Sequence, residues 1–155
     1  EGLTPPGFDY YAGNFRGSKF PSLETREVGV RADPLVGTPA LGVELRMFTV
    51  RTATLAGIDG LDANFGADET ERLLHAVRLA ALVFHSFLTV HPFLNGNGHV
   101  ARYLVWAVLQ RYGFMPLRWT VDPRPGAPEY SDAISAARRG SPEELEKLIL
   151  ASLAP

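Results

Sequence analysis

The sequence predicts a mainly α-helical domain with one small β-hairpin flap in its N-terminal part. From about residue 41 onward, apolar residues recur at helical spacing in segments that glycine and proline separate. Before that point helical periodicity is weak, and residues 26–31 alternate polar with small or apolar side chains, as a short strand does. At 155 residues we expect a single domain, with a core over about 41–153 and an N-terminal arm and flap over about 1–40.

Three helices are predicted in the first two thirds of the core. The first covers about 41–55 and ends before Gly57 and Gly60. The second begins after Asp68, which can cap it together with Glu71, and ends near Thr89. The third runs from Val100 to about Tyr112, and Gly113 closes it.

Two more helices complete the expected core. An irregular connection with four prolines covers 116–128. A helix over Tyr130–Arg139 follows, with Gly140 as its stop signal. The last helix reaches Leu153 and has Ser141 as its N-cap, with a proline at its first position and a capping glutamate after it.

The flap is predicted from the alternation over 26–31 and the turn signals at Asp33-Pro34 and 37–39. A strand or hairpin arm fits this pattern, and an irregular surface loop is the alternative.

The composition excludes several classes of protein. Hydrophobic residues make up 46% of the chain and charged residues 21%, which is typical of a soluble globular protein. The net charge of −2 gives no general attraction to nucleic acid or to an anionic membrane. The lack of cysteine excludes disulfides, zinc–thiolate sites and a cysteine nucleophile. The most apolar stretch, Leu79–Val90, is too short to cross a bilayer, so we expect neither a nucleic-acid nor a membrane partner.

The segment His91–Arg102, HPFLNGNGHVAR, carries the chemistry. Its Asn-Gly-Asn-Gly run precedes a helix, so backbone N–H groups can converge on a phosphate at the helix N-terminus. Arg102 can place its guanidinium fork on the same anion. His91, followed by a proline, can take a proton from a hydroxyl beside the bound phosphate. These residues indicate phosphoryl or nucleotidyl transfer.

The segment resembles the signature of the Fic family, His-Pro-Phe-x-(Asp/Glu)-Gly-Asn-Gly-Arg-x-x-Arg. It matches seven of the nine fixed positions, and the resemblance extends over about residues 10–153. It implies a Fic-like helical domain that transfers AMP from ATP to a Ser, Thr or Tyr hydroxyl of a protein. The matching residues are His91, Pro92, Phe93, Gly96, Asn97, Gly98 and Arg102.

The resemblance also implies a role for each matched position. His91 would be the general base, and Phe93 would anchor the loop in the core. Gly96, Asn97 and Gly98 would form the anion hole, while Arg102 would hold the terminal phosphate. The flap would dock a target segment by strand pairing, through Glu27, Val28, Gly29 and Val30.

Two positions depart from the signature. Asn95 stands where an acidic residue normally helps to hold Mg²⁺, and it is a weaker candidate ligand, so we expect Mg²⁺ binding to be weakened. His99 stands where the first arginine would contact phosphate, and it offers fewer donors. Both residues are either altered nucleotide ligands or remnants of a lost activity. The alternatives are therefore a degenerate, non-catalytic domain that binds a nucleotide or a protein, and a transferase that moves another phosphate-containing group, as in the Doc branch.

The expected partners follow from the same resemblance. ATP would be the substrate together with a protein that exposes a hydroxyl. The family's self-inhibiting string, Ser or Thr four residues before a Glu that precedes Gly or Asn, does not occur, so any inhibitory protein would be separate. Residues 1–11 carry no signal-peptide pattern, and the start at Glu1 suggests a trimmed or processed chain. We expect a bacterial protein that is cytoplasmic or, as a secreted effector, delivered into a host cytoplasm.

Overall fold

The computed structural model describes residues 6–29, 33–64, 68–125 and 128–154, and these residues form a helical protein. The mainly α-helical prediction is confirmed. Described in chain order, the elements are the 3-10 helices η1 (Asp9–Tyr11) and η2 (Ala40–Gly42) and the α-helices α1 (Val43–Ala63), α2 (Glu69–Val90), α3 (Asn97–Arg111), α4 (Pro128–Arg138) and α5 (Glu143–Ala151).

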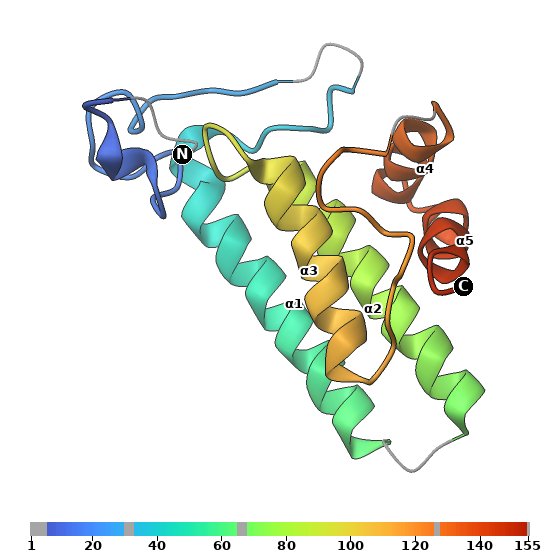
Figure 1. Cartoon of the computed structure of the whole chain (residues 1–155). Helices are drawn as coiled ribbons and strands as arrows, with labels where there is room; N and C mark the ends of the chain where they lie inside the picture. Colours follow the sequence, from blue (N-terminus) through green and yellow to red (C-terminus); the bar gives the residue numbers. More distant parts are fainter. Residues whose placement is uncertain (1–5, 30–32, 65–67, 126–127, 155) are drawn as a thin grey trace.

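Helix α2 is the centre of the fold. It packs against α1, α3, α4 and α5, and ten of its side chains are buried. As predicted, Asp68 caps it, because the carboxylate accepts hydrogen bonds from the N–H groups of Thr70 and Glu71 at 3.0 and 3.3 Å. Figure 1 shows α1, α2 and α3 running along one another, with the loop between α2 and α3 at the same end as the N-terminal arm.

Helix α1 is longer than predicted, because it continues through Gly57 and Gly60 to Ala63. The predicted stop near Leu55 is wrong. A Cβ atom on Gly57 would lie 2.5 Å from Cδ1 of Leu79, so the glycine allows α1 to approach α2 closely. Tertiary packing here outweighs the low helix propensity of glycine.

The other helix boundaries differ by a few residues. Helix α3 begins at Asn97, three residues before the predicted start. Gly113 and Gly140 follow α3 and α4 with φ of +84° and +95°, as their predicted role as stops requires. Ser141 is not the N-cap of α5; its N–H donates to Ala136 O at 3.0 Å and so completes the end of α4.

The predicted β-hairpin flap is not present in the part of the chain that the structure describes. Residues 26–29 and 34–39 form no strand, and Val30 lies outside the described residues. A Cβ atom on Gly37 would collide with the carbonyl oxygen of Val28, so the two segments do approach each other. The carbonyl groups of Arg26 and Thr38 accept hydrogen bonds from a buried arginine side chain instead of from a neighbouring strand.

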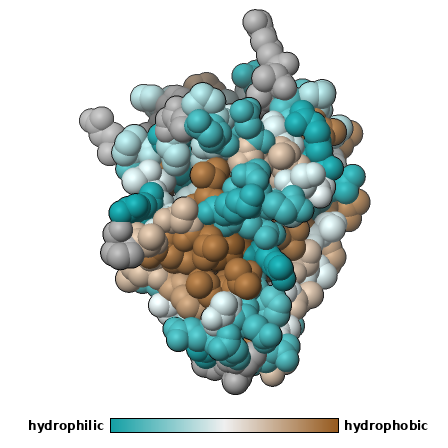
Figure 2. Space-filling model, turned by 90° about the vertical axis from the view of Figure 1, so that its right-hand side faces the viewer, coloured by the Kyte–Doolittle hydropathy of each residue, from teal (hydrophilic) through white to brown (hydrophobic). Residues whose placement is uncertain are grey.

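Helix α2 is longer than the apolar stretch 79–90 that the sequence analysis judged too short to cross a bilayer. Its 22 residues make it long and apolar enough to cross a bilayer by length and composition, although 56% of its most apolar window is buried inside the protein, as in a core helix. Figure 2 shows the right-hand side of the view in Figure 1, where apolar residues gather in the middle and polar residues surround them. Large apolar side chains exposed on α2 and α5 include Leu74, Leu82 and Leu150.

Candidate active site

His91 terminates α2 in the left-handed conformation, with φ of 53° and ψ of 59°. Its N–H still donates to Phe87 O at 3.0 Å, and the chain then turns out of the helix because Pro92 follows. A left-handed conformation is uncommon for a residue other than glycine and has to be held by its surroundings. The His91 ring is therefore presented at the corner between two helices.

The environment of His91 favours the neutral ring. Its half-buried position lowers the pKa of the imidazole, the nearby carbonyl of Leu88 opposes this shift, and the positive charges of Arg16 and Arg138 lower the pKa further. Its Nδ1 atom is buried and has no hydrogen-bond partner of ordinary geometry within the described ranges. A neutral histidine with one ring nitrogen buried can act as a base through the other.

Arg16 holds the backbone around His91 through hydrogen bonds, and the sequence analysis did not predict this role. Its side chain is fully buried, and the whole residue is 1% exposed. Nε donates to His91 O at 2.9 Å, and Nη2 donates to Thr38 O and Val90 O at 2.9 and 3.1 Å. Nη1 donates to Arg26 O at 2.8 Å. One guanidinium thus joins the N-terminal arm to the end of α2.

Asn97 closes the loop between the two helices with its side chain. Its Oδ1 accepts from Phe93 N at 2.9 Å and its Nδ2 donates to Phe93 O at 2.7 Å. The residue is 2% exposed. The Phe93 ring packs against Phe15 and Phe87, with centroids 5.3 and 6.1 Å apart. The side chain of Asn97 is thus engaged in holding the loop, and only its backbone N–H is available for an anion.

The N-terminus of α3 presents free backbone donors. Gly96 is its N-cap with φ of +78°, and no side chain caps the helix. The first hydrogen bond of the helix runs from Val100 N to Gly96 O at 3.0 Å. The N–H groups of Asn97, Gly98 and His99 precede it and have no intrahelical acceptor. Together with the helix dipole they form the kind of site that binds phosphate oxygens.

Arg102 lies beneath this N-terminus. It is 3% exposed, and its Nε donates to Val121 O at 2.7 Å. A Cβ atom on Gly98 would be 3.0 Å from Nη1 of Arg102, which places the guanidinium directly against the first turn. Its positive charge therefore reinforces the anion site, while Nε holds the segment that follows α3.

Asn95 and His99, the two residues that differ from the Fic signature, have partners within the protein. Asn95 is exposed, and its Oδ1 accepts from Gly96 N at 2.8 Å. Nε2 of His99 lies 3.5 Å from Oδ1 of Asp122, and 46% of its side chain is exposed. No group of three or more His, Asp or Glu side chains in the described ranges could hold a metal ion. The residues present do not fit a protein-built Mg²⁺ site, because Asn95 offers a single neutral oxygen that already accepts a hydrogen bond.

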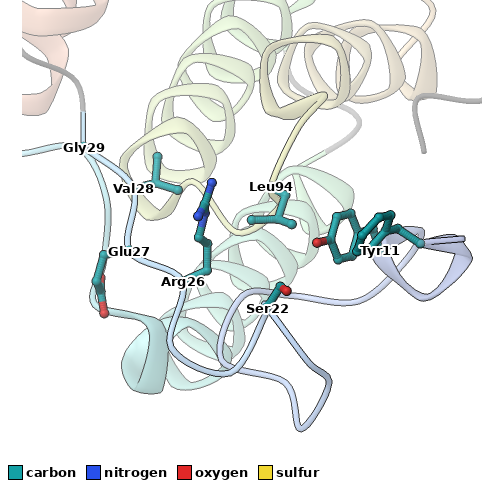
Figure 3. Close-up of a pocket in the computed structure, with 8 residues that line it drawn as sticks. Tyr11, Ser22, Arg26, Glu27, Val28, Gly29 and Leu94 are labelled. Atoms are coloured by element: carbon teal, nitrogen blue, oxygen red, sulfur yellow. The ribbon is translucent and has the colours of Figure 1, made fainter. Parts of the chain in front are cut away.

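A pocket of about 500 Å³ adjoins the loop. Leu94 of the loop, Arg26 and Val28 line it together with the aromatic residues of the arm, and Figure 3 shows these side chains around one cavity. Glu27 and Gly29 contribute to the same wall. The Glu27 carboxylate points away from the pocket, because its Oε1 accepts a hydrogen bond from Ala40 N at 2.9 Å. Three of the four predicted docking residues therefore lie beside the motif loop without forming a strand.

Comparison with known proteins points to the family that the motif resembles. Residues 46–109 match the model of the Fic/DOC family. The chain is 44% identical over 45 residues to a protein named protein adenylyltransferase Fic from Nematostella vectensis, which covers 29% of the chain and 10% of that protein. It is 33% identical over 73 residues to protein adenylyltransferase fic-1 from Caenorhabditis elegans, covering 47% of the chain and 14% of the relative.

A similar match is found to protein adenylyltransferase Fic from Drosophila grimshawi, with 32% identity over 72 residues, 46% of the chain and 14% of the relative. The chain therefore aligns with only 10% to 14% of the length of these proteins. All three relatives come from animals, so they lend no support to the expected bacterial origin.

Proposed function

We propose that this chain, whose residues 46–109 match the model of the Fic/DOC family, is a protein adenylyltransferase, which moves AMP from ATP to a protein hydroxyl. The observation that carries the proposal is the loop that Asn97 closes, because it sets a half-buried histidine at one end and a free helix N-terminus at the other. A base beside an anion site is the arrangement that nucleotidyl transfer requires.

In the proposed reaction the target hydroxyl oxygen attacks the α-phosphorus of ATP. A new bond forms between them, the bond from the α-phosphorus to the bridging oxygen breaks, and pyrophosphate leaves. His91 accepts the hydroxyl proton, and Nε2 is the ring nitrogen for this role because Nδ1 is buried. The N–H groups of Gly98 and His99, with Arg102 behind them, stabilise the charge on the phosphates. The described residues of this loop would leave any divalent ion to be held by the nucleotide phosphates themselves.

The pocket beside Leu94 supports a protein as the second substrate. It lies next to the loop and combines apolar and aromatic walls with the exposed Arg26. A side chain that flanks the modified hydroxyl could occupy it, which gives the proposed target a docking site without strand pairing.

One observation favours a second candidate, a non-catalytic domain that binds a nucleotide. Asp122 places a carboxylate beside His99, close to where phosphate would bind, and Asn95 supplies no negative charge for a metal ion. Such a domain would bind ATP weakly and transfer nothing. It would still use the helix N-terminus of α3 for the phosphates.

The test uses ATP labelled separately on the α- and γ-phosphates, with cell lysate as the source of targets and Mg²⁺ or Mn²⁺ present. The wild type is compared with His91→Ala and with His75→Ala, which replaces an exposed histidine within α2. We expect label from the α-phosphate to appear on protein with the wild type and with His75→Ala, but not with His91→Ala. Label from the γ-phosphate alone would indicate phosphate transfer. No label from either, with ATP still raising the melting temperature, would favour the non-catalytic domain.

A further inference from the structure

A second pocket, of about 540 Å³, lies between α1, the C-terminal half of α2 and the segment 34–39. Its volume is within the range of small-molecule sites. None of its lining residues belongs to the motif loop or to the pocket in Figure 3. It is therefore a separate cavity from the site described above.

Arg138, at the end of α4, lines this pocket and is largely buried. Only 9% of its side chain is exposed. Nη1 donates to Oδ2 of Asp33 at 2.7 Å, but Nε is buried and has no hydrogen-bond partner within the described residues. A buried guanidinium donor without an acceptor is costly, so its retention calls for an explanation.

Asp33 does not supply the missing acceptor, because it is already engaged. Its carboxylate also accepts from Ser135 Oγ at 2.9 Å and from Leu35 N at 3.2 Å. Its burial would raise the pKa of this carboxyl, but the bonds from Arg138, Ser135 and Leu35 outweigh that and hold it below its usual range. The ion pair thus fixes Arg138 in place and leaves Nε unsatisfied.

The rest of the lining adds donors and no negative charge. Arg46 of α1 is exposed, and Ser86 and Thr38, which carry hydroxyl groups, line the same cavity. Among the residues that the structure describes, no aspartate or glutamate lines the pocket. Apolar wall is provided by residues such as Leu35 and Val50. This combination suits a ligand with an oxyanion at one end and an apolar body at the other.

The pocket borders the turn that leads into His91. Gly37 N and Thr38 N donate to the carbonyl oxygens of Thr89 and Val90 at 3.0 and 3.2 Å, and all four residues line it. We propose that this cavity binds a small organic oxyanion, a carboxylate or a phosphate monoester, which pairs with Arg138 and Arg46. The site is independent of the proposed transferase reaction and would exist in a non-catalytic domain as well.

The experiment is a titration followed by ¹H–¹⁵N spectra that include the arginine Nε–H signals. The probes are benzoate, phenyl phosphate and, as the neutral control, benzamide. We expect saturable shifts of the Arg138 Nε–H and of the Ser86 and Thr89 amides with an anionic probe and none with benzamide. A response to benzoate alone identifies a carboxylate ligand, and a response to phenyl phosphate alone identifies a phosphate ester.

Three variants test the assignment. Arg138→Lys keeps a charge for Asp33 but removes Nε–H, and it should weaken binding about tenfold or more, the loss expected for a charge-assisted hydrogen bond. Arg46→Gln, at an exposed position, tests the rim without threatening the fold. Arg139→Lys, the exposed neighbour, should bind like the wild type.

Two results would overturn the proposal. One is the absence of any saturable shift with both anionic probes. The other is a set of shifts confined to the Gly96–His99 amides that persists in Arg138→Lys, because the probe would then occupy the motif loop.

Discussion

Replacing Arg16 by lysine should destabilise this protein far more than an ordinary surface substitution. The Arg16 guanidinium donates to four carbonyl groups that belong to separate parts of the chain, those of Arg26, Thr38, Val90 and His91, at 2.8 to 3.1 Å. Lysine keeps the positive charge but carries three donors on a single nitrogen atom, which cannot span the planar fork. We expect it to reach one or two of the four carbonyls.

The magnitude follows from the carbonyl groups left without a donor. A hydrogen bond to a charged group contributes about 1.5–3 kcal/mol, and a buried acceptor without a partner costs about 1–3 kcal/mol. With two or more carbonyls unpaired, the free energy of unfolding should fall by about 3 kcal/mol or more, a large part of the ~5–15 kcal/mol typical of a domain. At about 2–4 °C for each kcal/mol in a chain of this size, the melting temperature should fall by roughly 6–12 °C.

The assay is urea unfolding followed by far-ultraviolet circular dichroism. The matched control is Arg51→Lys, an exposed arginine on α1, whose effect should stay within ~0.5 kcal/mol. A loss below about 1 kcal/mol for Arg16→Lys would refute the reasoning, because the guanidinium would then not be satisfying these carbonyls in solution.

Three further outcomes are expected. As the pH falls below about 6.5, the free energy of unfolding should decrease. Burial lowers the pKa of His85 and of His91, so the unfolded chain binds protons in this range that the folded chain does not. A flat profile between pH 7.5 and 5.5 in urea unfolding would contradict this. Gly57→Ala places a Cβ atom 2.5 Å from Cδ1 of Leu79, and the overpacking cost of about 1–3 kcal/mol is offset in part by a gain of ~1 kcal/mol in helix propensity. Gly60→Ala, which meets nothing within 4 Å among the described residues, has the gain without the cost, so it should be the more stable of the two variants in the same assay. Asn97→Asp removes the donor half of a paired hydrogen bond, so it should lower the melting temperature by several degrees, corresponding to about 1–3 kcal/mol.

The helices could be predicted because their signals are local. The apolar face and the Asp68 cap of α2 lie within its own sequence, and the glycines after α3 and α4 mark their ends. The course of α1 could not be predicted in this way. Whether Gly57 stops the helix depends on how closely α2 approaches, and that distance is set by the packing of the whole core.

Within the site, the sequence identified the loop but not the residues that hold it. The string from His91 to Arg102 indicates a base and an anion site by residue type and order. Arg16 lies 75 residues before His91, and its acceptors are backbone carbonyls, which any residue carries. No pattern of side chains could therefore indicate this contact. The engagement of the Asn97 side chain with Phe93 likewise depends on the closed shape of the loop.

The departures at Asn95 and His99 change the charge of the site and leave its scaffold intact. Arg16 and the pair of hydrogen bonds between Asn97 and Phe93 hold the loop without the side chain of Asn95 or His99, and Asn95 adds a local hydrogen bond to Gly96 N. His99→Arg should therefore strengthen ATP binding about tenfold, because a guanidinium would offset the Asp122 carboxylate and add donors for phosphate.

Calorimetric titration of ATP tests this expectation, with Gln110→Arg, an exposed position near the far end of α3, as the control for added charge. An equal gain in both variants would mean that net charge alone attracts the nucleotide. No gain in His99→Arg would mean that position 99 does not face the phosphates, and the assignment of the anion site to this helix terminus would then fail. A gain confined to His99→Arg would mean that the loop already has the geometry that nucleotide binding needs, and that the missing positive charge at position 99 is what weakens ATP binding.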